Sequence, residues 1–248
     1  MQKHFYKLRF RADEVEWRIK AKRDLVFQFF EKYKKKQTKK IKLLDFGCGT
    51  GMLQLEFEKR FGYVEGYGVD ISKQAIQFCL VRGIKRAKLY DGNKLPYPSQ
   101  SFDIVCAVDV LEHIKDDLSS LKEIKRVLKK EGIGLFLVPA HQYLWSTRDI
   151  RLKHFRRYQT NELELKCREI GLTIVETKNV DFTLYFIFLL MHKLAKKKKA
   201  VADLGWETAE TNYLLSQIFY LYSVLENRLI NFFAFPVGLS KLVVVKKS

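Results

Sequence analysis

The sequence is poor in cysteine, and its few cysteines are not arranged as a cluster. Four are present among 248 residues, and none of them forms a CxxC pair. This spacing argues against a disulfide framework and against a cysteine-based metal site. We therefore expect free, buried thiols in a reducing, cytoplasmic setting, and we assign no metal site from the sequence.

A hydrophobic run long enough to cross a membrane is also absent. The apolar stretch 182–191 is ten residues long, whereas a helix needs about twenty residues to span a bilayer. A second stretch, 213–235, is interrupted by Glu226, Asn227 and Arg228. The first ten residues contain no apolar core of the kind that a signal peptide requires, so we predict no signal peptide.

Acidic residues are few compared with basic ones. The 28 Asp and Glu residues stand against 46 Lys and Arg residues, which leaves a net charge of +18. Residues 1–45 hold 15 basic and 6 acidic residues, 46–150 hold 15 and 13, and 151–248 hold 16 and 9. The excess is concentrated at the two ends, which predicts an anionic partner there. The alternative is a solvated, lysine-rich surface without such a partner.

Apolar runs alternate with segments of helical periodicity along the chain. We predict helices over 13–36, after residue 51, over 73–83, and over 118–132 with a cap at Gly132. The predicted strands are 41–47, 64–71, 86–92, 101–111, 132–140, 172–182 and 238–247. The alternation favours a parallel sheet with helices on both faces.

The segment LLDFGCGTG (43–51) joins the first predicted strand to a helix. Gly47 and Gly49 allow a tight turn and a close approach to a ligand, and Asp70 ends the second strand, where a carboxylate can accept both ribose hydroxyls. Met52 stands where a dinucleotide site needs a small residue. Asp45 would be unfavourable beside a pyrophosphate but suits the cationic amino-acid end of S-adenosylmethionine (SAM).

The order of these motifs resembles class I SAM-dependent methyltransferases, in particular the broad type 11 family. The resemblance covers about residues 40–182, including LLDFGCGTG, GVDIS, DGNKLPYPSQSFDIV and AVDVLEHI. It implies an α/β fold with a Rossmann-like, doubly wound sheet, mostly parallel, with a final antiparallel strand and a helical insertion between the last two strands.

The resemblance also implies SAM as the cofactor. In the family the glycine loop holds the methionine moiety, the acid after the second strand holds the ribose, and DG of the third motif borders adenine. The cofactor-binding residues predicted in this way are Asp45, Phe46, Gly47, Cys48, Gly49, Gly51, Asp70, Ile71, Asp91, Gly92 and Asp109.

Candidates for catalysis follow the fourth and fifth predicted strands, because ligands bind outside the carboxyl ends of parallel strands. Methyl transfer depends largely on positioning, and a general base is needed only if the acceptor must lose a proton. We name His113, His141 and His154 as candidate bases, with Glu112 beside them. The alternative for His113 is packing against its own loop.

The loop 141–158 is rich in polar and aromatic residues, which is typical of a substrate lid. Its arginines, Arg148, Arg156 and Arg157, could grip an anionic acceptor. The alternative is that they form salt bridges with the helix predicted at 160–170.

The apolar segments between the last two strands resemble a hydrophobic insertion found in a subset of the family. The subset also carries the LWS…D…H.RRY loop, an N-terminal segment similar to Trp17–Arg23, and a closing pattern met here by Glu226, Pro236, Gly238 and Ser240. The insertion could lie on a membrane with Lys196–Lys199 near anionic lipid, or it could cap the pocket or form a homodimer.

These observations predict four regions and one main function. The regions are an N-terminal helical cap (1–40), the SAM-binding core (41–182), the insertion (183–235) and a closing strand (236–248). The function is methyl transfer from SAM to a small-molecule or a lipid- or glycan-linked acceptor, in the cytoplasm and peripherally at the inner face of a membrane.

Two alternatives come from other classes of protein. An RNA methyltransferase could use the basic ends to bind phosphate, but a [DN]PP[YF] motif and a separate RNA-binding module are missing, so a nucleic-acid partner is favoured less. The other alternative is a non-catalytic SAM-binding or lipid-docking protein, which the intact glycine loop disfavours.

Overall fold

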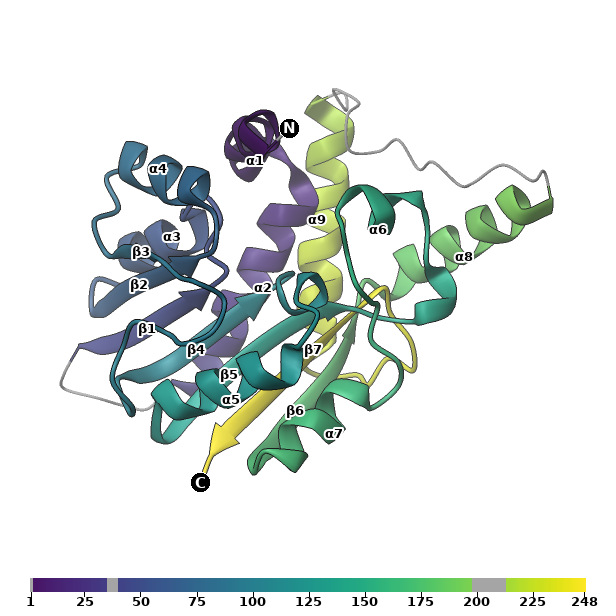
Figure 1. Ribbon diagram of the computed structural model, residues 1–248. Coiled ribbons are helices and arrows are strands. Elements are labelled where there is room, and N and C mark those ends of the chain that lie inside the picture. Colours follow the sequence, from purple (N-terminus) through teal and green to yellow (C-terminus); the bar gives the residue numbers. More distant parts are fainter. Residues whose placement is uncertain (1, 35–39, 198–212) are drawn as a thin grey trace.

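The computed structural model describes residues 2–34, 40–197 and 213–248. Seven strands form one twisted sheet in the order β3-β2-β1-β4-β5-β7-β6 (Figure 1). The strands are β1 (Ile41–Phe46), β2 (Val64–Asp70), β3 (Ala87–Leu89), β4 (Phe102–Val108), β5 (Leu128–Pro139), β6 (Leu172–Val180) and β7 (Ser240–Lys247).

The predicted fold class is confirmed. Strands β1 to β5 pair in parallel, and β7 lies antiparallel between β5 and β6. Val245 of β7, for example, pairs with Gly134 on one side and Ile174 on the other. The chain passes from β6 to β7 through two long helices, so the insertion joins two neighbouring strands of the sheet.

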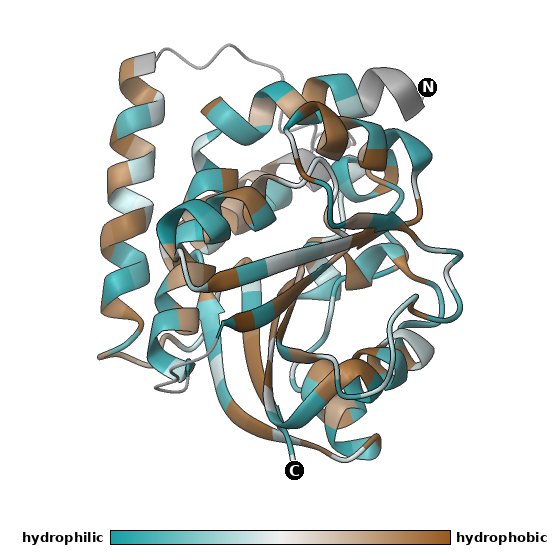
Figure 2. Ribbon diagram, turned by 90° about the vertical axis from the view of Figure 1, so that its left-hand side faces the viewer, coloured by the Kyte–Doolittle hydropathy of each residue, from teal (hydrophilic) through white to brown (hydrophobic). Residues whose placement is uncertain are grey.

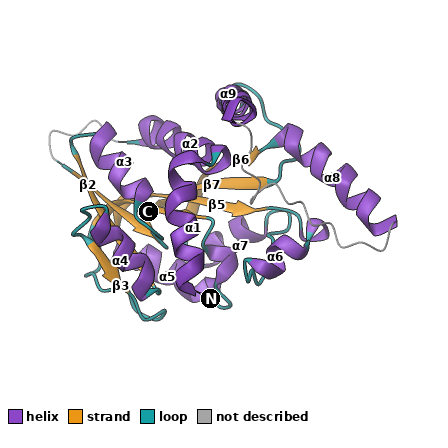
Figure 3. Cartoon of the chain, turned by 90° about the horizontal axis from the view of Figure 1, so that it is seen from above, coloured by secondary structure: helices purple, strands orange, loops and turns teal. Residues whose placement is uncertain are grey.

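Helices cover both faces of the sheet (Figures 1 and 3). They are α1 (Gln2–Val15), α2 (Trp17–Tyr33), α3 (Met52–Arg60), α4 (Lys73–Val81), α5 (Asp117–Val127), α6 (Thr147–Arg151), α7 (Glu162–Glu169), α8 (Phe182–Lys197) and α9 (Tyr213–Leu229), with short 3₁₀ turns η1 (Leu111–His113) and η2 (Gln142–Leu144).

The strand residues alternate between two cores, as the pleat of a strand requires. On β1, Leu43 packs in the core formed with α2 and α3, whereas the next residue, Leu44, packs with α5 and α7. Phe57 of α3 lies in the first core, against Phe27 at 4.7 Å and Phe30 at 5.0 Å between ring centroids. Burial of both sheet faces explains why the strands read as continuous apolar runs.

Two predicted helix boundaries are wrong. The helix predicted over 13–36 is two helices, because Glu16 is extended and its carboxylate caps α2 by accepting from the amides of Arg18 and Ile19. The helix predicted to end at Gly132 ends at Val127. The carbonyl of Val127 accepts from the amide of Ser101, and β5 begins at once with Leu128 opposite Phe102.

The insertion consists of α8 and α9. Helix α9 packs along α2, where Asn227 donates from Nδ2 to the carbonyl of Ala21 at 3.1 Å and Trp17 stacks on Phe219 at 5.3 Å. Among the described residues, no helix is both long and apolar enough to cross a membrane. The division into four regions stays a prediction, and parts of its first and third regions, 35–39 and 198–212, lie outside the described residues.

Glu226 connects the two helices of the insertion. Its carboxylate accepts from the backbone amides of Phe182 at 2.7 Å and Thr183 at 3.2 Å, at the start of α8, and from the hydroxyl of Tyr222 at 2.6 Å. The first amides of a helix have no partner within it, so a carboxylate there supplies both hydrogen bonds and a favourable charge.

We expect the substitution Glu226→Ala to lower the free energy of unfolding by about 2–3 kcal/mol, because it leaves helix amides and a hydroxyl without their charged partner. Urea denaturation followed by circular dichroism measures this loss. The control Glu169→Ala removes an exposed glutamate at the end of α7 and should change stability by less than about 0.5 kcal/mol. Equal effects of the two substitutions would contradict the role of Glu226.

Candidate functional site

The glycine loop between β1 and α3 has the backbone that its sequence predicts. Gly47, Gly49 and Gly51 have φ values of +76°, +54° and +79°, in the left-handed region that favours glycine. A Cβ at Gly47 would lie 2.2 Å from Val110, and one at Gly51 would lie 2.3 Å from Ile84. Gly49 differs, because a Cβ there would meet nothing within 4 Å. The loop is therefore packed at its two ends and open at its centre.

Three carboxylates surround this loop. Asp45 at the end of β1 and Asp70 at the end of β2 are buried, and Asp13 reaches in from α1. Burial, then the neighbouring Asp70 and Asp13, raise the pKa of Asp45 to about 7. Burial also raises the pKa of Asp70, against the effect of the amides of Ser72 and Gly49, which donate to its carboxylate at 2.8 and 3.0 Å.

These features fit a ligand that carries positive charge and lies against the backbone. A cation near Asp45 would relieve the repulsion among the carboxylates, and the open centre at Gly49 leaves room for a ligand to approach the loop. Each oxygen of Asp70 has a second lone pair in addition to the one that accepts an amide, so the carboxylate can also accept from hydroxyl groups. A sulfonium amino acid attached to a ribose has these properties.

Helix α1 covers the loop, whereas the sequence predicted only a general helical cap over 1–40 and no separate helix before residue 13. Thr50 of the loop donates from its hydroxyl to Asp13, and Arg82 of the α4 C-terminus donates to the carbonyl of Phe10 at 2.8 Å. The guanidinium of Arg82 also stacks on the Phe10 ring at 3.9 Å. Seen from above, α1 lies between α4 and α6 (Figure 3). Residues 2–12 lack the apolar periodicity that would have predicted this helix.

Asp109, which follows β4, contacts α2. Lys22 donates to both of its carboxylate oxygens, at 2.7 and 2.6 Å. The pKa of Asp109 is lowered, because the attraction of Lys22, with Arg9 and Arg148, outweighs burial. Asp109 has a φ of +48°, so the chain turns sharply at this point. The charge of this predicted cofactor ligand is therefore already matched by a lysine of the same chain.

The remaining predicted cofactor residues differ in their surroundings. Phe46 is buried in the core, so only its backbone faces the loop, and Cys48 packs its thiol against Cys79 at 4.0 Å. Ile71 is exposed beside Asp70. Asp91 is exposed and accepts from the amides of Asn93 and Lys94, a turn that Gly92 completes with a φ of +90°.

The loop 141–158 is held by two buried carboxylates. Asp149 accepts from Arg157 at 2.8 Å and from the backbone amide of Ser146 at 2.9 Å. Arg156 pairs with Asp117 of α5 at 3.1 Å. Arg156 and Arg157 therefore pair with Asp117 and Asp149, and the alternative pairing with the helix at 160–170 is wrong for both. Asp117 was not identified from the sequence.

The structure brings two of the three candidate bases together. The rings of His113 and His154 meet edge to face at 4.6 Å between centroids, and the buried Glu112 lies beside them. Burial, then the charge of His154, lower the pKa of His113 to about 4. His141 has other neighbours, with its ring packed against Tyr143 at 5.1 Å and Tyr185 at 5.3 Å.

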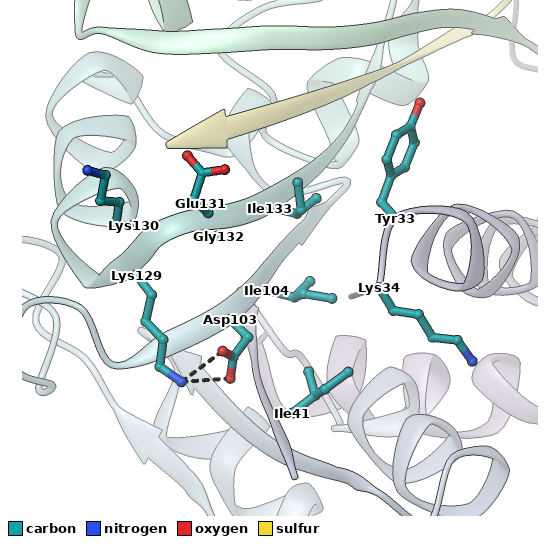
Figure 4. A pocket seen from close by; sticks show the side chains of 10 residues that line it. All are labelled: Tyr33, Lys34, Ile41, Asp103, Ile104, Lys129, Lys130, Glu131, Gly132 and Ile133. Carbon is teal, nitrogen blue, oxygen red and sulfur yellow. Dashed lines mark hydrogen bonds and ion pairs between the residues drawn. The ribbon is translucent and has the colours of Figure 1, made fainter. Parts of the chain in front are cut away.

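Two cavities lie away from the glycine loop. One, of about 30 Å³, lies at the amino-terminal ends of β1, β4 and β5, the opposite edge of the sheet, where Lys129 pairs with Asp103 (Figure 4). It is too small for a substrate. The other, of about 270 Å³, lies between α7, β6 and β7 and is lined in part by His141, Glu164 and Lys241.

Comparison with known proteins agrees with this geometry. Residues 44–136 match the profile of a methyltransferase domain, type 11. A demethylmenaquinone methyltransferase from Geobacillus stearothermophilus is 34% identical over 123 residues, which cover 46% of this chain and 52% of that protein. The chain therefore matches about half the length of this relative.

Solved structures of low sequence identity share the fold. One of them comes from a complex between the Haloferax volcanii Trm112 methyltransferase activator and a protein described as a methyltransferase. It superposes on this chain with a TM-score of 0.61 at 17% identity, over 96% of this chain and 93% of that chain. Haemonchus contortus phosphoethanolamine N-methyltransferase 2 in complex with SAM superposes at 0.58 and 19% identity, covering 89% and 51%. The family match over residues 44–136, the strand order and the glycine loop agree that this chain carries a SAM-dependent methyltransferase domain, for which SAM is the methyl donor.

Proposed function

We propose that this protein transfers the methyl group of SAM to a small-molecule or a lipid- or glycan-linked acceptor, in the cytoplasm and peripherally at the inner face of a membrane. The observation that carries the proposal is the carboxylate cluster of Asp45, Asp70 and Asp13 around the open centre of the loop at Gly49. That arrangement has the negative charge that a cationic ligand requires, and it leaves open space beside Gly49.

The predicted cofactor residues can be assigned to the parts of SAM. Asp45 would bind the amino group of the methionine moiety, and the backbone at Gly49 would lie along it. Asp70 would accept from the ribose hydroxyls, with Ile71 and the Asp91–Gly92 turn bordering adenine. SAM supplies a methyl group already activated on a sulfonium, so the protein has mainly to orient donor and acceptor.

The acceptor side lies at the ends of β4 and β5, where His113 and His154 meet. Nδ1 of His154 lies 2.9 Å from the carboxylate of Asp149, which fixes Nδ1 as the protonated nitrogen and leaves Nε2 as an acceptor. A histidine oriented in this way by a carboxylate can accept a proton from a hydroxyl or amine as the methyl group is transferred. We assign the proton acceptance to this pair and leave His141 outside it.

A small acceptor is supported by the named activity of the Geobacillus relative, which acts on a demethylated menaquinone. The RNA alternative is supported less, because lysines and arginines of α2 are paired within the protein. Arg23 binds Glu56 at 2.8 Å and Lys32 binds Glu176 at 2.7 Å, in addition to the pairing of Lys22 with Asp109. These three basic side chains of α2 are thereby matched within the protein.

A membrane surface is supported by the outer face of the insertion. Ile218, Leu221, Leu225 and Phe232 recur at helical spacing along α9 and beyond its end, and all are at least half exposed. Figure 2 shows α9 as the tall helix at the left edge of the molecule. Helix α8 adds a second exposed set: Phe186, Ile187, Leu190 and Leu194. The net charge of +18 suits anionic lipid, although the side chains of Lys196–Lys199 lie outside the described residues.

SAM binding tests the proposal directly. We expect the affinity to fall by roughly five- to tenfold between pH 7.5 and pH 6, because Asp45, with a pKa of about 7 before the cation binds, must lose its proton to bind it. Calorimetry at both pH values measures the change. The substitution Asp45→Asn should weaken binding and flatten this pH dependence. No SAM binding by folded protein would refute the proposed function, and an unchanged slope in the variant would refute the role of Asp45.

Two glycine substitutions separate ligand contact from folding. Gly49→Ala should weaken SAM binding by roughly tenfold or more, since its Cβ enters the open centre of the loop, while strain costs only about 1 kcal/mol of stability. Gly47→Ala adds a clash with Val110 to a similar strain, so its melting temperature should fall further. Thermal melting and calorimetry on both variants check this order, and the reverse order would contradict the placement of SAM at Gly49.

Sedimentation with anionic vesicles tests the membrane surface. We expect the protein to pellet with vesicles, and the double substitution Leu221→Ser with Leu225→Ser to reduce binding by roughly tenfold or more, because two exposed leucines no longer enter the lipid. The matched control Leu80→Ser changes an equally exposed leucine on α4 and should pellet like the original protein. Recovery of the original protein in the supernatant would contradict membrane contact.

A further inference from the structure

Glu112, His113 and His154 form a cluster in which each side chain offers one ligand atom, and these atoms lie within 4.8 Å of one another. Glu112 and His113 belong to η1 after β4, and His154 follows α6. The amide of Phe155 donates to the carbonyl of Glu112 at 2.7 Å, which holds the two segments together. About forty residues separate them in the chain, which is why the sequence did not indicate a metal site.

Glu112 is only 1% exposed, and one of its carboxyl oxygens, Oε2, has no hydrogen-bond partner among the residues that the structure describes. A buried carboxyl oxygen without a partner is costly and unusual in a folded protein. Its neighbours in the cluster are two imidazoles, so the arrangement has the composition of a ligand set.

His154 is oriented as metal-binding histidines usually are, and His113 lies beside it. Nδ1 of His154 is bound to the carboxylate of Asp149 at 2.9 Å, and that carboxylate is itself held by Arg157 and Ser146. In metal sites such outer contacts fix the tautomer and direct the other ring nitrogen at the ion. The ring of His113 meets that of His154 edge to face at 4.6 Å between centroids.

We propose that Glu112, His113 and His154 bind a divalent transition-metal ion, Zn²⁺ or Fe²⁺, at the acceptor side of the site. Two imidazoles and one carboxylate are a donor set that suits these ions and leaves a coordination position open, whereas Mg²⁺ and Ca²⁺ prefer oxygen ligands alone. A tetrahedral zinc site places ligand atoms about 3.4 Å apart. The side chains therefore need to close by about 1 Å around the ion.

Charges of both signs surround the cluster. Asp109 and Asp149 are negative, and Lys22, Arg157 and Arg9 are positive. Binding an ion would ionise Glu112 and use its free oxygen. In a methyltransferase the ion would lower the pKa of an acceptor hydroxyl nearby, which would then lose its proton to solvent water rather than to the histidines. This last step rests on the proposed function, but binding of the ion does not.

The test uses the full chain without a histidine tag, stripped with a chelator. Calorimetric titration with Zn²⁺ should give one site per chain, and Co²⁺ should give the visible absorption bands of a site with nitrogen ligands. Glu112→Gln keeps the shape of the side chain and should weaken Zn²⁺ at least tenfold. His113→Gln should do the same, while the control His141→Ala, outside the cluster, should bind like the original protein.

The outcomes separate the two proposals. One-to-one binding that is lost in Glu112→Gln and His113→Gln, with both variants folded by circular dichroism, supports the site. No stoichiometric binding of Zn²⁺, Fe²⁺ or Co²⁺, or binding that survives both substitutions, overturns it. SAM binding is measured separately, by calorimetry on the protein stripped of metal. Absence of metal binding would then leave the SAM proposal unaffected, and absence of SAM binding would leave the metal titration valid.

Discussion

Repulsion among three buried carboxylates around the glycine loop is the physical constraint that shapes this part of the protein. Asp13, Asp45 and Asp70 converge on the glycine loop from three separate elements. Like charges out of water repel strongly, so these carboxylates need hydrogen-bond donors and cations. The chain supplies some of them: the hydroxyl of Thr50 and the guanidinium of Arg9 for Asp13, and two backbone amides for Asp70. A cationic ligand such as SAM supplies more.

This constraint also explains the N-terminal helices. Helices α1 and α2 lie outside the matched methyltransferase domain, yet their polar side chains reach into it. Asp13 joins the loop, and Lys22 neutralises Asp109 after β4. Helix α9 packs on the same α2 through Asn227 and Phe219. The insertion and the end of β4 are therefore connected through α2, so a partner on the outer face of α9 would contact a helix that packs on α2.

Around the loop 141–158, by contrast, the carboxylates are paired with arginines of the loop. Asp149 and Asp117 bind the arginines of the loop 141–158 and hold it against η1 and α5. Arg156 and Arg157 thus order the loop, and the groups that lie together beside it are Glu112, His113 and His154. Ordered polar contacts around reactive side chains are typical of sites that position a substrate or an ion.

The sequence by itself determined the α/β class, the strands, the glycine loop and its link to Asp70, because apolar periodicity and glycine conformation are local properties. It also indicated a helical insertion. It could not indicate that the helix at 118–132 ends at Val127, since the strand pairing of Leu128 with Phe102 overrides a strong local helical pattern. Only the tertiary structure placed α1 over the loop, paired Lys22 with Asp109, and joined His154 to His113 and Glu112 while leaving His141 among tyrosines. These contacts connect residues far apart in the chain, and no local pattern records which distant side chain will meet which.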